Sequence, residues 1–194
     1  MKYNSKIATL LPYKENYTIS KAAAASLWVS DFYKYSRFKK NNFIFGSTDT
    51  KDFLSKNYIN IKINNIKSKF SSSTTEYCNN FIAISKKFDF EIIEIHNRPL
   101  VFIQLKKVFK SKFILYFHND PLTMKGSKNK KERLLLLNSV DKIIFVSKWV
   151  QKRFFINLDD KLLHKTEIVY PSIAIAKKRM LKKKKITFVG KLNK

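Results

Sequence analysis

The chain has 194 residues, of which 44% are hydrophobic and 14% aromatic, so the composition supports a folded core and excludes an intrinsically disordered protein. The length fits one domain, or one domain with a piece of another. The 40 lysines and arginines against 14 acidic residues give a formal net charge of +26, which favours anionic partners but is also what an AT-rich genome produces on a solvated surface.

The single cysteine, Cys78, excludes an internal disulfide and a cysteine-rich metal site. The apolar run at the N-terminus is too short for a signal peptide, and no window approaches the ~20 apolar residues of a membrane span. We therefore expect a cytoplasmic protein, and its charge also suits peripheral contact with the inner face of an anionic membrane.

Short apolar runs rich in Ile, Val and Phe recur along the chain, and many are unbroken rather than alternating. Such runs are typical of strands that are covered on both faces, as in a parallel sheet between helices. The predicted strands are Lys6–Leu11, Asn42–Gly46, Tyr58–Ile63, Phe90–Ile95, Lys112–Phe117, Lys142–Val146 and Thr166–Tyr170.

Helix-forming segments fit between several of these strands. The predicted helices are Ser20–Arg37, Ser73–Phe88, Asn97–Phe109, Lys130–Ser139 and Ser147–Phe155. Ser20 is expected to cap the first helix, and Ser73 with Glu76 to form a capping box at the second. Asn97 is expected to cap the third, with Pro99 in its first turn. The alternation predicts an α/β protein with a Rossmann-like parallel sheet and helices on both faces.

The C-terminal segment differs in composition from the rest. Residues 1–175 form the predicted domain, and residues 176–185, "AKKRMLKKKK", have the charge density of an exposed linker. Residues 186–194, "ITFVGKLNK", then begin another buried strand with nothing after it to pair with. We interpret this strand as the first of a second domain that the chain lacks.

The usual phosphate and metal motifs are missing. With only three glycines the chain cannot form the G-x-G-x-x-G fingerprint of dinucleotide binding, and Gly126–Lys128 lacks the earlier glycine of a P-loop. The three histidines do not have the spacing of zinc ligands, and no G-x-S-x-G hydrolase motif occurs. We expect no metal and no bound cofactor.

A nucleic-acid partner is not favoured beyond the charge itself. The lysines are spread through every predicted element, most aromatic residues lie inside predicted strands and helices, and no RNA-recognition signature occurs. A basic nucleic-acid-binding α/β protein stays as an alternative.

Polar side chains gather where four predicted strands end. The carboxyl ends of parallel strands meet at one edge of a sheet, where such folds bind ligands. Asn97 and Asp120 could instead cap turns, and His96 could be a packed histidine near the core, but four polar ends on one edge favour a ligand site. The candidate residues are Glu15, Asn16, His96, Asn97, Arg98, His118, Asn119, Asp120 and Ser147.

The segments "IEIHNRP", "LYFHNDPLTMKGSK", "VDKIIFVSKWVQKRF", "EIVYPSI" and "ITFVGKLNK" occur in an order that resembles the N-terminal half of glycosyltransferase family 4 enzymes with the GT-B fold. The resemblance covers nearly the whole chain. It implies transfer of a hexose-type sugar from a nucleotide-sugar donor to a glycan or lipid-linked acceptor, with retention at the anomeric carbon and without a metal. Polysaccharide or other cell-envelope biosynthesis is the implied setting.

The resemblance also implies roles for the strand-end residues. His118 matches the histidine that lies close to the transferred sugar, so it is the predicted catalytic residue. The other candidates are predicted to line the cleft on the acceptor side, and Arg98 suits a phosphate or carboxylate.

Two departures from the family pattern affect the expected activity. The loop "PYKENYTISKAAAA" has no glycine where many relatives have several, which argues against close approach of a donor phosphate there. The domain that carries the family's paired glutamates and its basic diphosphate site is missing. We expect the fragment alone to be inactive, and a stand-alone glycan-binding module is the second alternative.

Overall fold

The computed structural model describes residues 6–13, 15–63 and 72–171. Seven parallel strands form one sheet in the order β3-β2-β1-β4-β5-β6-β7. The strands are β1 (Ile7–Leu10), β2 (Asn42–Gly46), β3 (Tyr58–Asn60), β4 (Ile92–His96), β5 (Lys112–Phe117), β6 (Lys142–Phe145) and β7 (Thr166–Ile168). The helices are α1 (Ala24–Tyr35), α2 (Ser73–Ser85), α3 (Pro99–Leu105), α4 (Lys130–Ser139) and α5 (Lys148–Phe155), with 3-10 turns η2 (Pro121–Thr123) and η3 (Asp160–Lys165). The predicted Rossmann-like α/β fold is confirmed.

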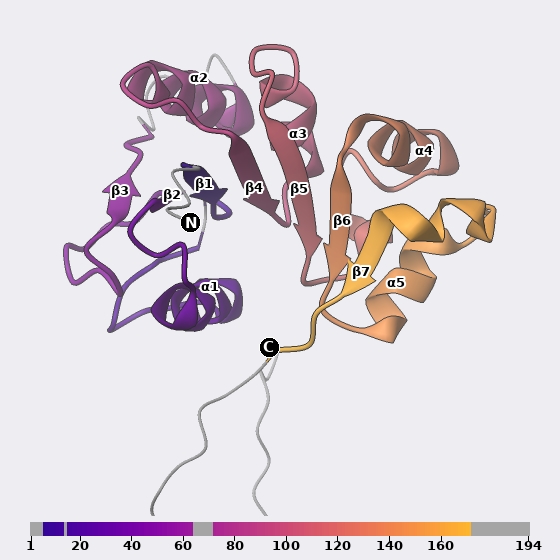
Figure 1. The fold of residues 1–194 in the computed structure, drawn as a ribbon, viewed down its shortest axis with the longest axis horizontal. Coiled ribbons are helices and arrows are strands. Elements are labelled where there is room, and N and C mark those ends of the chain that lie inside the picture. Colours follow the sequence, from indigo (N-terminus) through magenta and orange to yellow (C-terminus); the bar gives the residue numbers. More distant parts are fainter. Residues whose placement is uncertain (1–5, 14, 64–71, 172–194) are drawn as a thin grey trace, which may run out of the picture.

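Helices cover both faces of the sheet, and Figure 1 separates α1, at the lower left, from α2 and α3 at the top. Alternate strand residues such as Phe45, Ile93 and Phe113 point to one face, where they join side chains of α2 to α5 in a continuous apolar core. Phe81 of α2 packs edge-on against Phe45 at a centroid distance of 5.0 Å. This face holds most of the buried apolar surface.

The opposite face is covered by α1 over the middle of the sheet. Trp28 and Val29 of α1 form a smaller cluster with Leu11, Tyr17 and Ile44. The same face also carries polar side chains from the strands, because Thr9 and Glu94 lie opposite each other in the β1–β4 register.

The register brings the four polar strand ends together. Leu10 pairs with Ile95, and His96 pairs with Tyr116, which lies two residues before His118. Phe117 in turn pairs with Phe145, so the loops that follow β1, β4, β5 and β6 leave the sheet at one edge.

The predicted start of the first helix and the predicted cap of the second are wrong, and local hydrogen bonds explain both. The first helix starts at Ala24 rather than Ser20, because the amide nitrogens of Ile19 and Ser20 donate to the backbone and side chain of Asp52. The second is capped by Ser72, whose hydroxyl accepts from Thr75 N at 3.2 Å, rather than by Ser73.

The predicted cap at Asn97 is also wrong. Arg98 precedes the first residue of α3, Pro99, and Asn97 has a left-handed backbone with φ of 53°. The predicted linker and additional strand, residues 176–194, lie outside the described residues.

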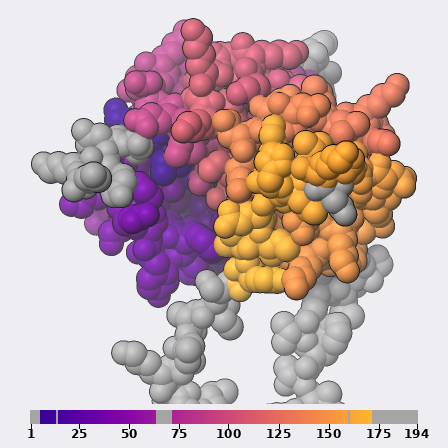
Figure 2. All heavy atoms as spheres, turned by 45° about the vertical axis from the view of Figure 1, so that its right-hand side comes forward, coloured from indigo at the N-terminus to yellow at the C-terminus, as the bar shows by residue number. Residues whose placement is uncertain are grey.

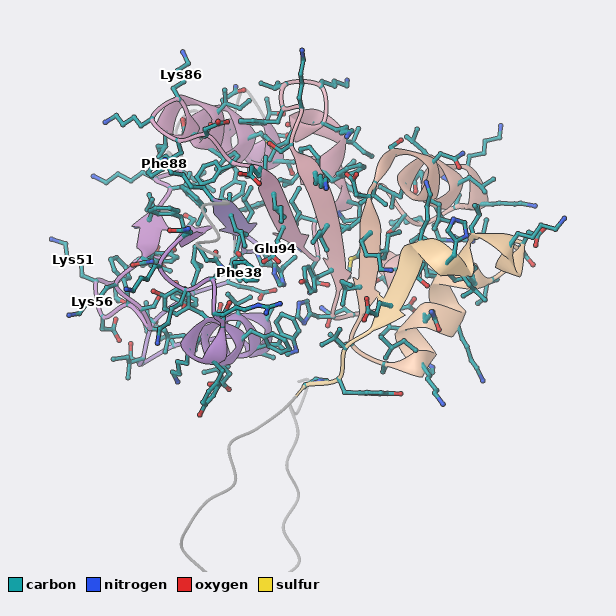
Figure 3. The ribbon with its side chains drawn as sticks, viewed as in Figure 1. Phe38, Lys51, Lys56, Lys86, Phe88 and Glu94 are labelled. Carbon is teal, nitrogen blue, oxygen red and sulfur yellow. The ribbon has the colours of Figure 1, made fainter. Side chains whose placement is uncertain are left out.

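The described part of the chain contains no helix with both the length and the apolar character that a membrane span requires. Many of its lysines lie on the solvent side, and Lys51, Lys56 and Lys86 point away from the body of the molecule in Figure 3. This distribution fits charge that is solvated over the surface more than charge gathered for one partner.

Candidate functional site

A cleft of about 550 Å³ lies at the carboxyl edge of the sheet. It is bordered by the first turn of α1, by the ends of β4, β5 and β6, and by the segment that follows β7. In Figure 2 the two parts of the chain that meet here, the violet N-terminal third and the yellow segment after η3, lie side by side. The lining residues are Glu15, Ala23, Ala24, Ala25, Leu27, Trp28, Asp31, Asn97, His118, Asn119, Val146 and Pro171.

The cleft therefore brings together Glu15, Asn97, His118 and Asn119 from among the predicted site residues. They come from three different loops that are up to about a hundred positions apart in sequence. Parallel strand ends place them together, as the alternation of strands and helices predicts.

His118 is held from two directions. Its backbone N–H donates to Oδ1 of Asn97 at 2.7 Å, and the left-handed backbone of Asn97 directs that side chain across to β5. Its ring nitrogen Nε2 lies 2.8 Å from Nδ1 of His96. The edge of Trp28 packs against the ring at a centroid distance of 5.2 Å. Burial lowers the pKa of His118 to about 4, so the ring is neutral near pH 7.

His96 lies behind His118 rather than on the cleft surface. It is 0% exposed, and its ring stacks on Tyr116 at a centroid distance of 4.4 Å. Burial, followed by the neighbouring His118, lowers its pKa well below the usual value. His96 does not line the main cleft, and it reaches a ligand there only through His118.

Arg98 lines a second, adjoining groove of about 250 Å³ that shares Asn97 with the main cleft. Its guanidinium lies over the ring of Tyr13 at 5.3 Å, and Nη1 donates to the backbone oxygen of Asn97 at 2.9 Å. Lys125 lines the same groove, whereas no described carboxylate lies within ion-pair distance of Arg98. This groove therefore offers positive charge to an anionic group.

The position of the loop that carries Lys125 depends on Gly126. Its φ of 91° is a conformation that other residues adopt only with strain, and a side-chain carbon there would lie 3.1 Å from both Pro99 and Leu100. Glycine thus lets the loop after β5 lie directly against the start of α3.

Glu15 is an enclosed carboxyl at the rim. Burial raises its pKa, and the nearby Arg98 partly offsets that effect. Its Oε2 has no hydrogen-bond partner among the described residues. It can therefore accept from a hydroxyl of a ligand in the cleft, or donate when it is protonated.

Asn16, Asp120 and Ser147 have local structural roles. The backbone oxygen of Asn16 accepts from Ala23 N at 3.4 Å, in the turn before α1. Asp120 caps η2 and pairs with Arg153 at 2.8 Å, which lowers the pKa of its carboxyl. Ser147 caps α5 by accepting from Val150 N at 3.2 Å. None of these three lines the cleft described above.

A half-buried carboxyl group that sequence analysis missed lies on the α1 face. Glu94, labelled in Figure 3 close to Phe38, lines a cavity of about 110 Å³ under α1 together with Thr9, Trp28 and His96. Oγ1 of Thr9 lies 2.8 Å from Oε2 of Glu94 and 3.0 Å from Oδ1 of Asn42.

The Thr9 hydroxyl has one proton and can donate it to only one of its two neighbours. The other contact is completed either by a proton on Glu94 or by the Asn42 amide turned so that its nitrogen donates to Thr9. Burial raises the pKa of Glu94. In the sequence the only signal was a glutamate in the middle of an otherwise apolar strand.

The cleft residues that sequence analysis missed are mostly apolar. Ala23, Ala24, Ala25 and Trp28 lie inside a predicted helix and Val146 ends a predicted strand, so nothing in the sequence marks them as cleft residues. A small side chain beside a cleft and a small side chain inside a helix look alike in sequence. Within the described part of the chain, no three His, Cys, Asp or Glu residues lie close enough together to hold a metal ion.

Searches for related sequences found no family model and no curated protein that match the chain. Several solved structures match in fold. The lipopolysaccharide outer core galactosyltransferase WaaB superposes with a TM-score of 0.60 at 14% identity, over 89% of this chain and 47% of that one. HepE of Anabaena in complex with UDP-glucose superposes with a TM-score of 0.58 at 12% identity, over 87% of this chain and 44% of that one. Sucrose-phosphate synthase from Thermosynechococcus elongatus superposes with a TM-score of 0.57 at 13% identity, over 86% of this chain and 48% of that one.

The chain thus has the Rossmann-like fold of one half of the GT-B glycosyltransferases. It spans less than half the length of these three solved structures.

Proposed function

We propose that this chain is the acceptor-side domain of a glycosyltransferase that uses a nucleotide-sugar donor. The observation that carries the proposal is the neutral, half-buried His118 at the rim of a cleft on the carboxyl edge of the sheet. A ring nitrogen there can hydrogen-bond a sugar hydroxyl, or an oxygen on which negative charge develops as the donor departs. The fold shared with WaaB and with HepE bound to UDP-glucose supports this function over a nucleic-acid-binding one.

In this proposal residues 1–175 bind the acceptor, and residues 176–194 lead into a donor-binding domain. The transferred sugar lies beside His118, Asn119 and Glu15, with a hexose and retention at the anomeric carbon as the family resemblance implies. Without the donor domain, no turnover is expected from this chain alone.

The acceptor is a glycan or lipid-linked sugar that carries an anionic group. Arg98 and Lys125 supply charge in a groove that joins the main cleft at Asn97. A phosphate or carboxylate on the acceptor would lie in that groove while the hydroxyl that receives the sugar points towards His118. The strong positive charge also suits an acceptor presented at an anionic membrane from the cytoplasmic side.

Acceptor binding can be measured on the chain itself by nuclear magnetic resonance. Titration with glucose 1-phosphate is expected to shift the backbone amides of Asn97, Arg98, His118 and Asn119. Arg98→Ala is expected to weaken binding about 10- to 100-fold, because a charge-assisted hydrogen bond contributes about 1.5–3 kcal/mol. Lys86→Ala, which changes the net charge equally on the far surface, is the matched control.

A short single-stranded DNA is the competing probe. If DNA shifts the cleft amides at lower concentration than the sugar phosphate, and Lys86→Ala weakens binding as much as Arg98→Ala does, the acceptor proposal is wrong. A salt-dependent, nucleic-acid-binding protein would then be the better description.

Turnover separates the enzyme from a stand-alone glycan-binding module. The chain is joined to the polypeptide encoded after Lys194, and release of nucleotide from a panel of nucleotide-sugars is followed with sugar-phosphate acceptors. His118→Ala is expected to lower kcat about 100- to 1000-fold, as loss of one transition-state hydrogen bond does elsewhere. Binding without turnover in the joined protein would favour the module.

A further inference from the structure

His96 and His118 share a hydrogen bond, and its direction decides whether His118 presents a hydrogen-bond donor or an acceptor to the cleft. Nδ1 of His96 lies 2.8 Å from Nε2 of His118, across the ends of β4 and β5. Burial lowers the pKa of both rings, so both are neutral near pH 7 and each carries one ring proton. One of those protons lies between the rings, and its owner sets the tautomer of the other ring.

The free nitrogen of His118 is the one available to a ligand. With Nε2 occupied by His96, Nδ1 has no hydrogen-bond partner among the described residues, and it is not one of their enclosed, unpaired polar atoms. Since His118 lines the cleft, Nδ1 is the ring atom that a bound oxygen would meet.

Two arrangements of the protons satisfy the shared hydrogen bond. If His118 donates from Nε2, its Nδ1 is a lone pair, and His96 carries its proton on the buried Nε2. If His96 donates from Nδ1, then His118 carries its proton on Nδ1, and Nε2 of His96 is a buried lone pair. The first arrangement gives the cleft an acceptor or base, and the second gives it a donor.

The cavity under α1 favours the second arrangement. Nε2 of His96 and Nε1 of Trp28 are both enclosed without a hydrogen-bond partner among the described residues, and both side chains line this cavity. The indole nitrogen can only donate. In the first arrangement both groups are donors, so one water between them would accept twice and would have to pass both of its own protons to other atoms of the cavity such as those of Glu94 or Thr9. The second encloses one donor and one acceptor, which a single water molecule can bridge in a cavity of about 110 Å³.

We propose that His96 is a positioning residue that donates its Nδ1–H to Nε2 of His118 and so holds His118 in the tautomer with an Nδ1–H donor facing the cleft. His118 then stabilises a ligand oxygen with negative charge, and it does not remove a proton from the acceptor hydroxyl. This consequence rests on the proposed function, whereas the tautomer itself does not.

The tautomer can be measured directly on the chain. Long-range proton–nitrogen correlation spectra of protein with ¹⁵N-labelled histidine rings distinguish a protonated from an unprotonated ring nitrogen. At pH 7 His118 is expected to show a protonated Nδ1 and an unprotonated Nε2. His164, whose Nδ1 lies 2.9 Å from the backbone oxygen of Lys161 and so donates to it, gives a reference ring with a protonated Nδ1 in the same spectrum. A protonated Nε2 on His118 in the wild-type chain would overturn the proposal without any variant.

Two substitutions then test whether His96 is the cause. In His96→Asn the side-chain amide can place an N–H where Nδ1 of the imidazole was, so His118 is expected to keep its tautomer. In His96→Phe the ring volume stays but the donor is lost, so the major tautomer of His118 is expected to change to the Nε2-protonated form that a free imidazole side chain prefers. A folded His96→Phe protein with an unchanged His118 tautomer would also overturn the proposal.

The outcomes for tautomer and function are separate. If the tautomer is as expected but the joined protein transfers no sugar, the proposed function fails and the assignment of His96 stands. If the joined protein transfers sugar while the wild-type His118 carries its proton on Nε2, the assignment of His96 fails alone.

Discussion

The two faces of the sheet are built for different purposes. The face covered by α2 to α5 is a continuous apolar core of phenylalanine, leucine and isoleucine side chains. The face covered by α1 alone encloses more polar atoms without a hydrogen-bond partner among the described residues, at Glu15, Ser26, Trp28, Ser30 and His96, whereas on the other face Nε of Arg133 in α4 is such an atom. Unsatisfied buried polar groups cost stability and cluster where function needs them. We infer that one face stabilises the fold while the other tolerates the groups that form the site.

Replacing one aromatic side chain on each face should give the largest difference in the free energy of unfolding. Phe81, on the α2 side, is 0% exposed and packs against Phe45, Phe90 and Phe109. Phe81→Ala is expected to lower the free energy of unfolding by about 3–5 kcal/mol. Phe32, on α1, is 40% exposed although it stacks on Trp28. Phe32→Ala is expected to cost about 1 kcal/mol, because only part of its ring is removed from water in the folded chain.

Urea unfolding followed by circular dichroism measures both variants. Equal losses of unfolding free energy in the two variants would contradict the division of the molecule into a stabilising face and a functional face. A loss at Phe32 larger than that at Phe81 would reverse it.

The next largest effect concerns pH and lies on the α1 face. A histidine with a pKa of about 4 in the folded state and 6.5 as its ordinary value binds its proton more readily when unfolded. Its contribution to stability is therefore present above pH 6.5 and is lost as the pH falls towards 4. The expected loss for His118 is on the order of 3 kcal/mol over that range.

The matched variant is His118→Asn, measured by urea unfolding between pH 7 and pH 4. Glu15 and Glu94, whose pKa values burial raises, lose stability in the opposite direction as the pH rises above 4.5, and both are present in the two proteins. His96, whose pKa burial also lowers, is likewise present in both proteins. The difference between the two proteins therefore reports His118 together with its contact to His96. The wild type should lose stability relative to the variant as the pH falls, and a constant difference would show that His118 is not buried as a neutral ring.

The apolar face could be predicted from sequence, and the polar face could be predicted only in part. Unbroken runs such as "KFILYF" predict buried parallel strands because both of their faces must be covered, and the order of the elements then predicts the fold. Strand ends predict where His118 and Asn119 lie, because parallel strands finish at one edge. These inferences need only local pattern and general rules of topology.

The remaining features depend on contacts between distant parts of the chain. Asp52 ends the extension of α1 towards Ser20 by accepting its amide, from 32 positions away in sequence. Asp120 does not line the cleft and instead accepts a hydrogen bond from Arg153, which lies 33 positions away in sequence. The register of β4 and β5 places His96 behind His118. The sequence shows which polar residues follow a strand. It does not show which of them are bound by another residue of the fold and which remain available to a ligand.

The start of each helix gives the smallest and most local contrast between the two faces. Ser72 caps α2 with its hydroxyl, whereas Ala23, at the same position of α1, has an extended backbone with φ of −82° and ψ of 164° but no side chain that can accept. Ser72→Ala is expected to cost about 1 kcal/mol, and Ala23→Ser to add about 0.5–1 kcal/mol, because its backbone already has the geometry of a cap. Thermal unfolding of both variants measures the pair. Ala23 also lines the cleft, so a failure of Ala23→Ser to stabilise would mean that water in the open cleft satisfies the first amides of α1 as well as a hydroxyl does. The uncapped start would then be a neutral feature of the site and not a cost that the α1 face bears for its function.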